Sequence, residues 1–315
     1  HEWLLWWLCW ISWSKNFPVE RFLKLFGKVN NLTIAHDPEI PMKQISQHRG
    51  FQLIMTKKVI MKNSVFKNNQ NYVLFNLYDI PRASYYTTIV QTYLTFENIT
   101  VLNNSAVLYD ANSPYFSQFF IYSPSKPVNI LFNNSYFSNN SNCISVRKFL
   151  FLTWLVNGLI ASFENSQANM SFVNNTFDNN YAIQAGAVFS SKNMRQQTSS
   201  LNLTNNTFTN NRCDKNGGVF SFILTDYNMH SMNNTYQNNT AGLAGGVGYA
   251  LRTSFVLREE TAIYQDNSAG LIGGAWYISL NNYKINLQSL NFSQTSFTNS
   301  IAGQSILFVF PSDSQ

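Results

Sequence analysis

The chain has 315 residues, of which 45% are apolar, 16% aromatic and only 11% charged. This composition indicates one large folded domain whose surface relies on uncharged Asn, Ser and Thr. Residues 1–67 hold ten Lys/Arg against four Asp/Glu, whereas residues 68–315 hold eleven of each. A neutral body without a basic stripe argues against nucleic acid as a partner.

Residues 1–30 form an aromatic and basic N-terminal segment. Five Trp lie between residues 3 and 13, and basic residues follow from Lys15 onward. About a dozen apolar residues are too few for a membrane-spanning helix, which needs about twenty. We expect a cap over the first turn of the following domain. The alternatives are peripheral membrane contact or partner docking through residues 3–13, and a remnant of a signal peptide.

From residue 62 onward a short phrase with a central aromatic residue recurs. It reads KNSVFKNN at 62–69, NNSYFSNN at 133–140, NNTFDNN at 174–180, NNTFTNN at 205–211 and NNTYQNN at 233–239, with weaker copies after. The aromatic positions are Phe66, Phe96, Phe137, Phe177, Phe208, Tyr236, Tyr264 and Phe297. A glycine phrase follows as AGAV at 185–188, GGVF at 217–220, GGVG at 245–248 and GGAW at 273–276.

A repeat of about 30 residues is typical of helical repeats, propellers or β-solenoids. The apolar runs are short and rich in Phe, Val, Ile and Tyr, as in VNILF and WYISL, and Asn, Gly and Ser interrupt them often. This pattern disfavours helix pairs, and the period is short for propeller blades. It predicts an all-β fold, a right-handed parallel β-helix over residues 31–315, in which stacked turns bury a common core.

Each phrase has a structural role in such a coil. Inward aromatic residues would stack from turn to turn. An Asn two residues after the aromatic would form a hydrogen-bonded amide ladder. The predicted ladder comprises Asn68, Asn98, Asn139, Asn179, Asn210, Asn238 and Asn299. The glycines would supply positive φ or close backbone approach at another corner, followed by a small residue in a crowded core.

Together, the F-x-N and GGA/GGV phrases resemble the repeats of chlamydial polymorphic outer-membrane proteins. They also resemble related right-handed β-helix repeats in large surface proteins of ciliates and other protists. The resemblance covers about residues 60–305, although the copies at Phe66 and Phe96 lack the glycine phrase. It implies a surface-exposed, adhesive or coat-forming protein. The Asn-, Phe-, Ile- and Tyr-rich composition is also consistent with a protist.

Twelve Asn-x-Ser/Thr sequons indicate an N-glycosylated protein, extracellular or on the cell surface. We expect Asn174, Asn205 and Asn233, three residues before the aromatic, to point outward and carry glycans. The other expected sites are Asn133, Asn202, Asn291, Asn103, Asn169 and Asn31. Three sequons, at Asn98, Asn139 and Asn238, coincide with the predicted ladder, which would shield them. Apart from covalent glycans, no cofactor is expected.

The sequence contains no recognisable catalytic or metal site. The β-helix also serves as the scaffold of pectate lyases and polygalacturonases, which need clustered carboxylates or acidic calcium ligands. The eleven Asp/Glu after residue 67 are mostly isolated, and the adjacent Glu259 and Glu260 should face opposite ways. The three Cys are too scattered for a disulfide framework, although a Cys143–Cys213 bridge is an alternative to packed thiols.

Two non-enzymatic hypotheses therefore lead. In the first, the chain is a structural subunit of a coat or fibre that self-associates through solenoid ends or binds other coat proteins. The apolar run ILFVF at 306–310 would leave a sheet edge able to pair with another chain. In the second, the chain is a monomeric adhesin or receptor ectodomain that binds a ligand through a glycan-free face. A polysaccharide lyase or hydrolase is the third alternative.

Overall fold

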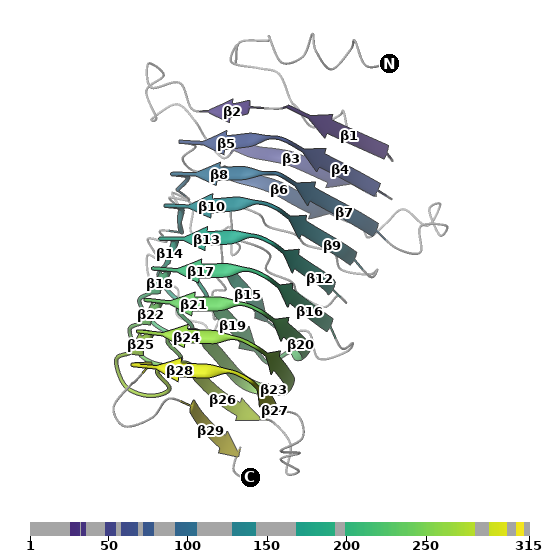
Figure 1. Cartoon of the computed structure of the whole chain (residues 1–315). Coiled ribbons are helices and arrows are strands. Elements are labelled where there is room, and N and C mark those ends of the chain that lie inside the picture. The colour runs from purple at the N-terminus through teal and green to yellow at the C-terminus, as the bar shows by residue number, and fades with distance from the viewer. Residues whose placement is uncertain are drawn as a thin grey trace, which may run out of the picture.

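The computed structural model shows an all-β, right-handed parallel β-helix (Figure 1). It describes residues 26–31, 33–35, 48–54, 58–68, 72–78, 92–105, 128–142, 168–192, 199–280, 290–300 and 307–311. Every strand pair in these residues is parallel, and the chain advances one rung with each turn of the coil. The predicted fold class is confirmed.

Sheet 1 is a long wall that runs the length of the coil. Its strands, in spatial order, are β1 (Phe26–Asn30), β4 (Lys58–Lys62), β7 (Thr92–Glu97), β9 (Val128–Asn133), β12 (Ala168–Val173), β16 (Ser199–Thr204), β20 (Asp226–Met232), the second half of β23 (Gly248–Glu260) and β27 (Leu290–Ser293). Burial alternates along these strands, as in β9, because one face lines the core and the other faces solvent.

Sheet 2 follows sheet 1 around a sharp corner in every rung and has nine strands. They are β2 (Thr33–Ala35), β5 (Val65–Lys67), β8 (Thr100–Leu102), β10 (Tyr136–Ser138), β13 (Thr176–Asp178), β17 (Thr207–Thr209), β21 (Thr235–Gln237), β24 (Ile263–Gln265) and β28 (Ser296–Thr298). A short bridging sheet comes next, with β11 (Ser141–Asn142), β14 (Tyr181–Ala182), β18 (Arg212–Cys213), β22 (Thr240–Ala241) and β25 (Ser268–Ala269).

Sheet 3 closes the coil in its C-terminal half. It contains β15 (Phe189–Lys192), β19 (Phe220–Ile223), the first half of β23, β26 (Trp276–Leu280) and β29 (Leu307–Pro311). Nearer the N-terminus, β3 (His48–Ile54) pairs with β6 (Tyr72–Tyr78). Strand β29 contains most of the ILFVF run and pairs with β26.

The predicted aromatic row is present in sheet 2. From Phe137 to Phe297, neighbouring ring centroids lie 4.6–5.1 Å apart and the rings are nearly parallel. The row comprises Phe137, Phe177, Phe208, Tyr236, Tyr264 and Phe297, preceded in register by Phe66 and Val101. Stacking at the rung spacing accounts for the recurrence of an aromatic residue at this position.

The repeat spacing predicts Phe96 in this row, and this prediction is wrong. Phe96 lies in β7 of sheet 1, where its ring stacks on Phe132 at 4.7 Å. The true equivalent of Phe66 in that rung is Val101. This rung lacks an aromatic residue at the anchor position, so the nearest preceding Phe matches the repeat spacing in its place.

The coil also begins earlier than the repeat suggested. Strand β1, within the segment grouped as residues 1–30, pairs with β4, and Ile34 in β2 lies in register with Phe66. The Trp-rich residues 3–13, with the roles proposed for them, lie outside the described residues.

The glycine phrase forms a third corner, between the bridging sheet and sheet 3. Gly217, Gly245 and Gly273 have φ of 68–70°, as the sequence predicted. At the second glycine, a Cβ added to Gly218 would lie 2.0 Å from the Gly246 carbonyl oxygen, so only glycine allows the rungs to approach there. Ala187, which takes the place of the second glycine in its copy, and Val247, which follows the second glycine, are fully buried.

Candidate functional site

The phrase N-N-T-F-x-N-N describes two corners on either side of one sheet 2 strand. Corner 1 joins sheet 1 to sheet 2, and corner 2 joins sheet 2 to the bridging sheet. In the copy at 174–180, Asn174 and Asn179 have φ of 55° and 51° and are exposed. Asn is among the few residues that adopt this left-handed conformation readily, which explains the first Asn of each pair.

The second Asn of each pair is buried and forms a ladder. At corner 2, Asn211 Nδ2 donates to Asn239 Oδ1 at 3.0 Å and to the Phe177 carbonyl oxygen at 2.9 Å. The Asn211 Oδ1 in turn accepts from the backbone and side-chain nitrogens of Asn180. The ladder comprises Asn104, Asn140, Asn180, Asn211, Asn239 and Asn267 and ends on the Ser300 hydroxyl.

A second buried ladder follows corner 1. It comprises Asn175, Asn206 and Asn234. Asn175 and Asn206 each donate to the next amide and to a backbone carbonyl oxygen, and Asn234 donates to the Leu203 carbonyl oxygen. In this way, each buried amide satisfies backbone and side-chain groups on neighbouring rungs, which would be costly to leave unpaired in the core. Together, the two ladders fix the stacking register along both edges of sheet 2.

The predicted ladder is therefore one residue out of place. Six of its members are exposed at corner 2 with φ of 49–57°: Asn68, Asn139, Asn179, Asn210, Asn238 and Asn299. Asn98 lies at corner 1. Some exposed amides also bond between rungs, such as Asn179 Nδ2 to Asn139 Oδ1 at 2.6 Å. The left-handed residue breaks the strand alternation, so the next side chain turns inward.

All twelve sequon asparagines lie in described residues, and none of them is buried. Corner 1 holds Asn31, Asn98, Asn174, Asn205 and Asn233; corner 2 holds Asn103, Asn139 and Asn238; sheet 1 holds Asn133, Asn169, Asn202 and Asn291. The expected difference between an outward group and a shielded group is absent, because both kinds of corner are exposed. Whether any of these residues carries a glycan stays a prediction.

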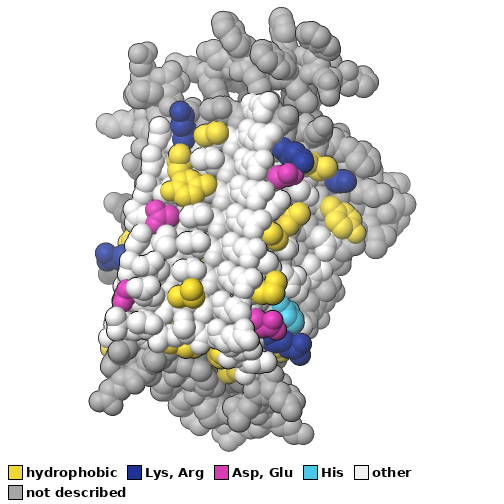
Figure 2. Space-filling model, viewed as in Figure 1, with side chains coloured by type: hydrophobic (Ala, Val, Ile, Leu, Met, Phe, Trp, Pro, Cys, Tyr) yellow, Lys and Arg dark blue, Asp and Glu magenta, His cyan; other side chains and the backbone are white. Residues whose placement is uncertain are grey.

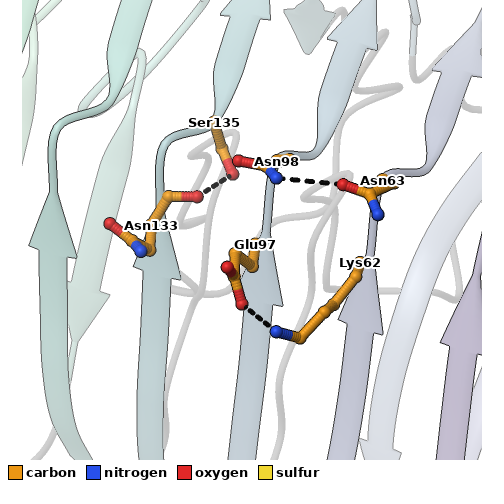
Figure 3. A network of polar contacts seen from close by, with 6 residues as sticks. All are labelled: Lys62, Asn63, Glu97, Asn98, Asn133 and Ser135. Atoms are coloured by element: carbon orange, nitrogen blue, oxygen red, sulfur yellow. Dashed lines mark hydrogen bonds and ion pairs between the residues drawn. The ribbon is translucent and has the colours of Figure 1, made fainter.

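The corner amides are engaged with one another between rungs. Figure 3 shows Asn98 Nδ2 donating to Asn63 Oδ1 at 2.9 Å, beside the Lys62–Glu97 ion pair. In the next rung, the Ser135 hydroxyl donates to the Asn133 carbonyl oxygen at 2.9 Å. At Asn205, Nδ2 donates to Asn174 Oδ1 at 3.2 Å. An Asn amide has two N–H donors. If a glycan replaces one of these hydrogens, the other N–H can still donate to the amide of the neighbouring rung.

The face formed by sheets 1 and 2 carries few charges. Figure 2 shows this face mostly in the white of backbone and uncharged polar side chains, with scattered charged and apolar groups. In sheet 2, one outward row contains Thr176, Thr207 and Thr235 on successive rungs. Uncharged polar side chains therefore keep this surface in water, as the composition predicted.

Among the described side chains, one carboxyl group is buried in the core. Glu259 is fully buried in β23, whereas the adjacent Glu260 is exposed, as strand alternation requires. The Ser231 hydroxyl donates to Glu259 Oε1 at 2.6 Å, and the Tyr264 hydroxyl donates to Oε2. Burial raises the pKa of Glu259 to about 7, and these hydrogen bonds oppose the rise.

The remaining reactive residues do not form a site with Glu259. His230 is exposed on sheet 1, and Cys213 is a free, buried thiol whose pKa is raised to about 12 by burial. Cys143 lies outside the described residues. Within the described ranges, no group of three or more His, Cys, Asp and Glu could hold a metal ion. These same ranges contain no helix long and apolar enough to cross a membrane.

No family model matches this chain, and searches of curated proteins and of solved structures returned no match either.

Proposed function

We propose that this chain is a non-catalytic, N-glycosylated structural protein that forms part of an extracellular or cell-surface coat or fibre. The observation that best supports this proposal is the placement of the sequons. All twelve sequon asparagines are accessible, on corner 1, corner 2 or sheet 1. Secretory glycosylation requires accessible acceptor asparagines. Glycans at these positions would cover the weakly charged face of the coil.

The rigidity of the coil supports the same role. Two buried amide ladders and an aromatic row run through successive rungs, so each rung is fixed to its neighbours by hydrogen bonds and ring stacking. A solenoid of this kind is elongated and can be extended by stacking. The repeat phrases that resemble protist and chlamydial surface proteins are the ones that form these ladders, which agrees with a coat or fibre.

A specific observation favours the second candidate, a monomeric adhesin or receptor ectodomain. Among the described residues, the bridging sheet, the glycine corner and sheet 3 carry no sequon asparagine. This side presents Leu243 and Leu271, the latter 63% exposed, and a stacked pair formed by Tyr249 and Tyr277 at 5.1 Å. Exposed apolar groups on a glycan-free side are typical of a binding surface.

Secretion of the chain from a eukaryotic host would test the proposal. Intact mass before and after enzymatic removal of N-glycans reports modification, and size-exclusion chromatography with light scattering reports assembly. A glycosylated product that forms high-mass assemblies supports the coat or fibre. A glycosylated monomer supports the ectodomain, and a chain secreted without glycans contradicts both.

A further inference from the structure

Glu259 occupies a position that other rungs fill with apolar side chains. In register along sheet 1, the inward row reads Met61, Phe96, Phe132, Phe172, Leu203, Ser231, Glu259 and Phe292. Only two adjacent members of this row are polar. Placing a carboxyl group here costs free energy unless the surroundings compensate for it.

The neighbouring aromatic row changes in the same two rungs. Phe208 gives way to Tyr236 and Tyr264, and the row returns to Phe at the next rung. The Tyr236 hydroxyl lies 3.2 Å from Ser231 Oγ, and the Tyr264 hydroxyl donates to Glu259. Trp276 Nε1 in β26 donates to the Tyr264 hydroxyl at 2.8 Å. The hydroxyl groups therefore occur where the carboxyl group needs partners.

This polar cluster also completes the corner 1 ladder. The position after Asn234 in that ladder is Ala262, which has no side-chain amide. Asn234 Nδ2 instead donates to Ser231 Oγ at 2.8 Å, and Ser231 donates to Glu259. The last amide of the ladder is thus connected to the carboxyl group through one hydroxyl.

Among the described residues, the groups packed around Glu259 include no positive charge. Ser231 and Tyr236 come from β20 and β21, Tyr264 from β24, and the register partner in β27 is Phe292. The titratable neighbours His230, Arg258 and Glu260 are exposed, on the opposite face of their strands. No described cation forms an ion pair with Glu259. Ionisation would therefore place a negative charge in the core that only hydrogen bonds from neighbouring hydroxyl groups offset.

We propose that Glu259 is a proton-controlled latch that holds the C-terminal rungs β24, β27 and β28 closed when its carboxyl group is neutral. The sign follows from linkage: a carboxyl group with a raised pKa in the folded state binds its proton more tightly there than in an opened state. Closure is strongest below pH 4.5 and weakens as pH rises to about 7. In a coat subunit, the latch would couple the C-terminal rungs to the acidity of the compartment.

Amide hydrogen exchange on the full chain, between pH 4.5 and 8 and corrected for intrinsic exchange rates, tests the latch. A pKa difference from 4.5 to about 7 predicts local opening of β24 and β28 about 100-fold more frequent at pH 7.5 than at pH 4.5. Strands β4 and β8 belong to distant rungs and serve as the internal reference.

Two variants separate the latch from general pH effects. Glu259→Gln, which keeps the shape and stays neutral, should abolish the pH dependence in β24 and β28. Glu260→Gln, on the exposed side of the same strand, should retain it. Equal protection of β24 across this pH range in the unmodified chain, relative to β4 and β8, would overturn the proposal even if Glu259→Gln does not fold. Loss of the pH dependence in Glu260→Gln alone would also overturn it.

Discussion

Replacement of Asn211 by Ala should destabilise the protein far more than replacement of its neighbour Asn210. The Asn211 amide is fully buried and is the acceptor for both the backbone N–H and the Nδ2 of Asn180. It also donates to Phe177 and Asn239. Each buried group left without a partner costs about 1–3 kcal/mol, so two orphaned Asn180 donors give about 2–6 kcal/mol.

Asn210→Gly is the matched control. Asn210 is exposed with φ of 56°, which glycine adopts without strain, and its side chain makes one exposed hydrogen bond to Asp178 at 2.9 Å. We expect a loss of less than about 1 kcal/mol. Urea unfolding followed by far-ultraviolet circular dichroism and by aromatic fluorescence would measure both variants. An Asn210→Gly loss equal to or greater than that of Asn211→Ala would refute the assignment of the buried ladder.

Three further predictions follow from the core and the glycine corner. Phe177→Ala removes a ring stacked between Phe137 at 4.9 Å and Phe208 at 5.0 Å, and should cost about 3–5 kcal/mol in urea unfolding; a loss below about 1 kcal/mol would contradict the continuous aromatic row. Gly245→Ala places a Cβ 2.1 Å from the Gly248 carbonyl oxygen at a φ of 69°, so the thermal unfolding midpoint of this variant should fall sharply. An unchanged midpoint would show that the corner tolerates side chains. The free energy of unfolding should decrease by up to about 3 kcal/mol between pH 4.5 and 7, because the pKa of Glu259 is raised to about 7 in the folded protein. Urea midpoints measured over this pH range would test this, and the same decrease in Glu259→Gln would remove Glu259 as the cause.

The sequence predicted the coil and most of its core because those features repeat. Seven of the eight aromatic positions, the positive φ of the glycines and the outward Asn174, Asn205 and Asn233 follow from periodicity and strand alternation. The position of the buried Asn ladder did not follow from the periodicity. The alternation of side chains between the two faces of a strand fails at a residue with left-handed backbone. The doubled Asn in each phrase was the available signal, since one Asn turns the chain and the next enters the core.

Features that occur in a single rung were harder to predict. In the rung of Val101, the stretch NITVLNN fits the phrase only if Val is allowed at the anchor position. The Glu259 cluster depends on three residues, Ser231, Tyr236 and Tyr264, that change together in neighbouring rungs. Once the register is known, two changes in one rung become visible in the sequence. Ser231 stands where the preceding rung has Leu203, and Tyr236 stands where it has Phe208.

Glycopeptide mapping of the natively isolated protein tests the central claim, a glycosylated structural coil outside the cell, most directly. The account predicts N-glycans at Asn174, Asn205 and Asn233 on corner 1, with further glycans at corner 2 and sheet 1. It also predicts no glycan on the bridging sheet or sheet 3 within the described residues, which lack sequons. Native protein with all twelve sequon asparagines unmodified would contradict the extracellular assignment and the coat or fibre function with it.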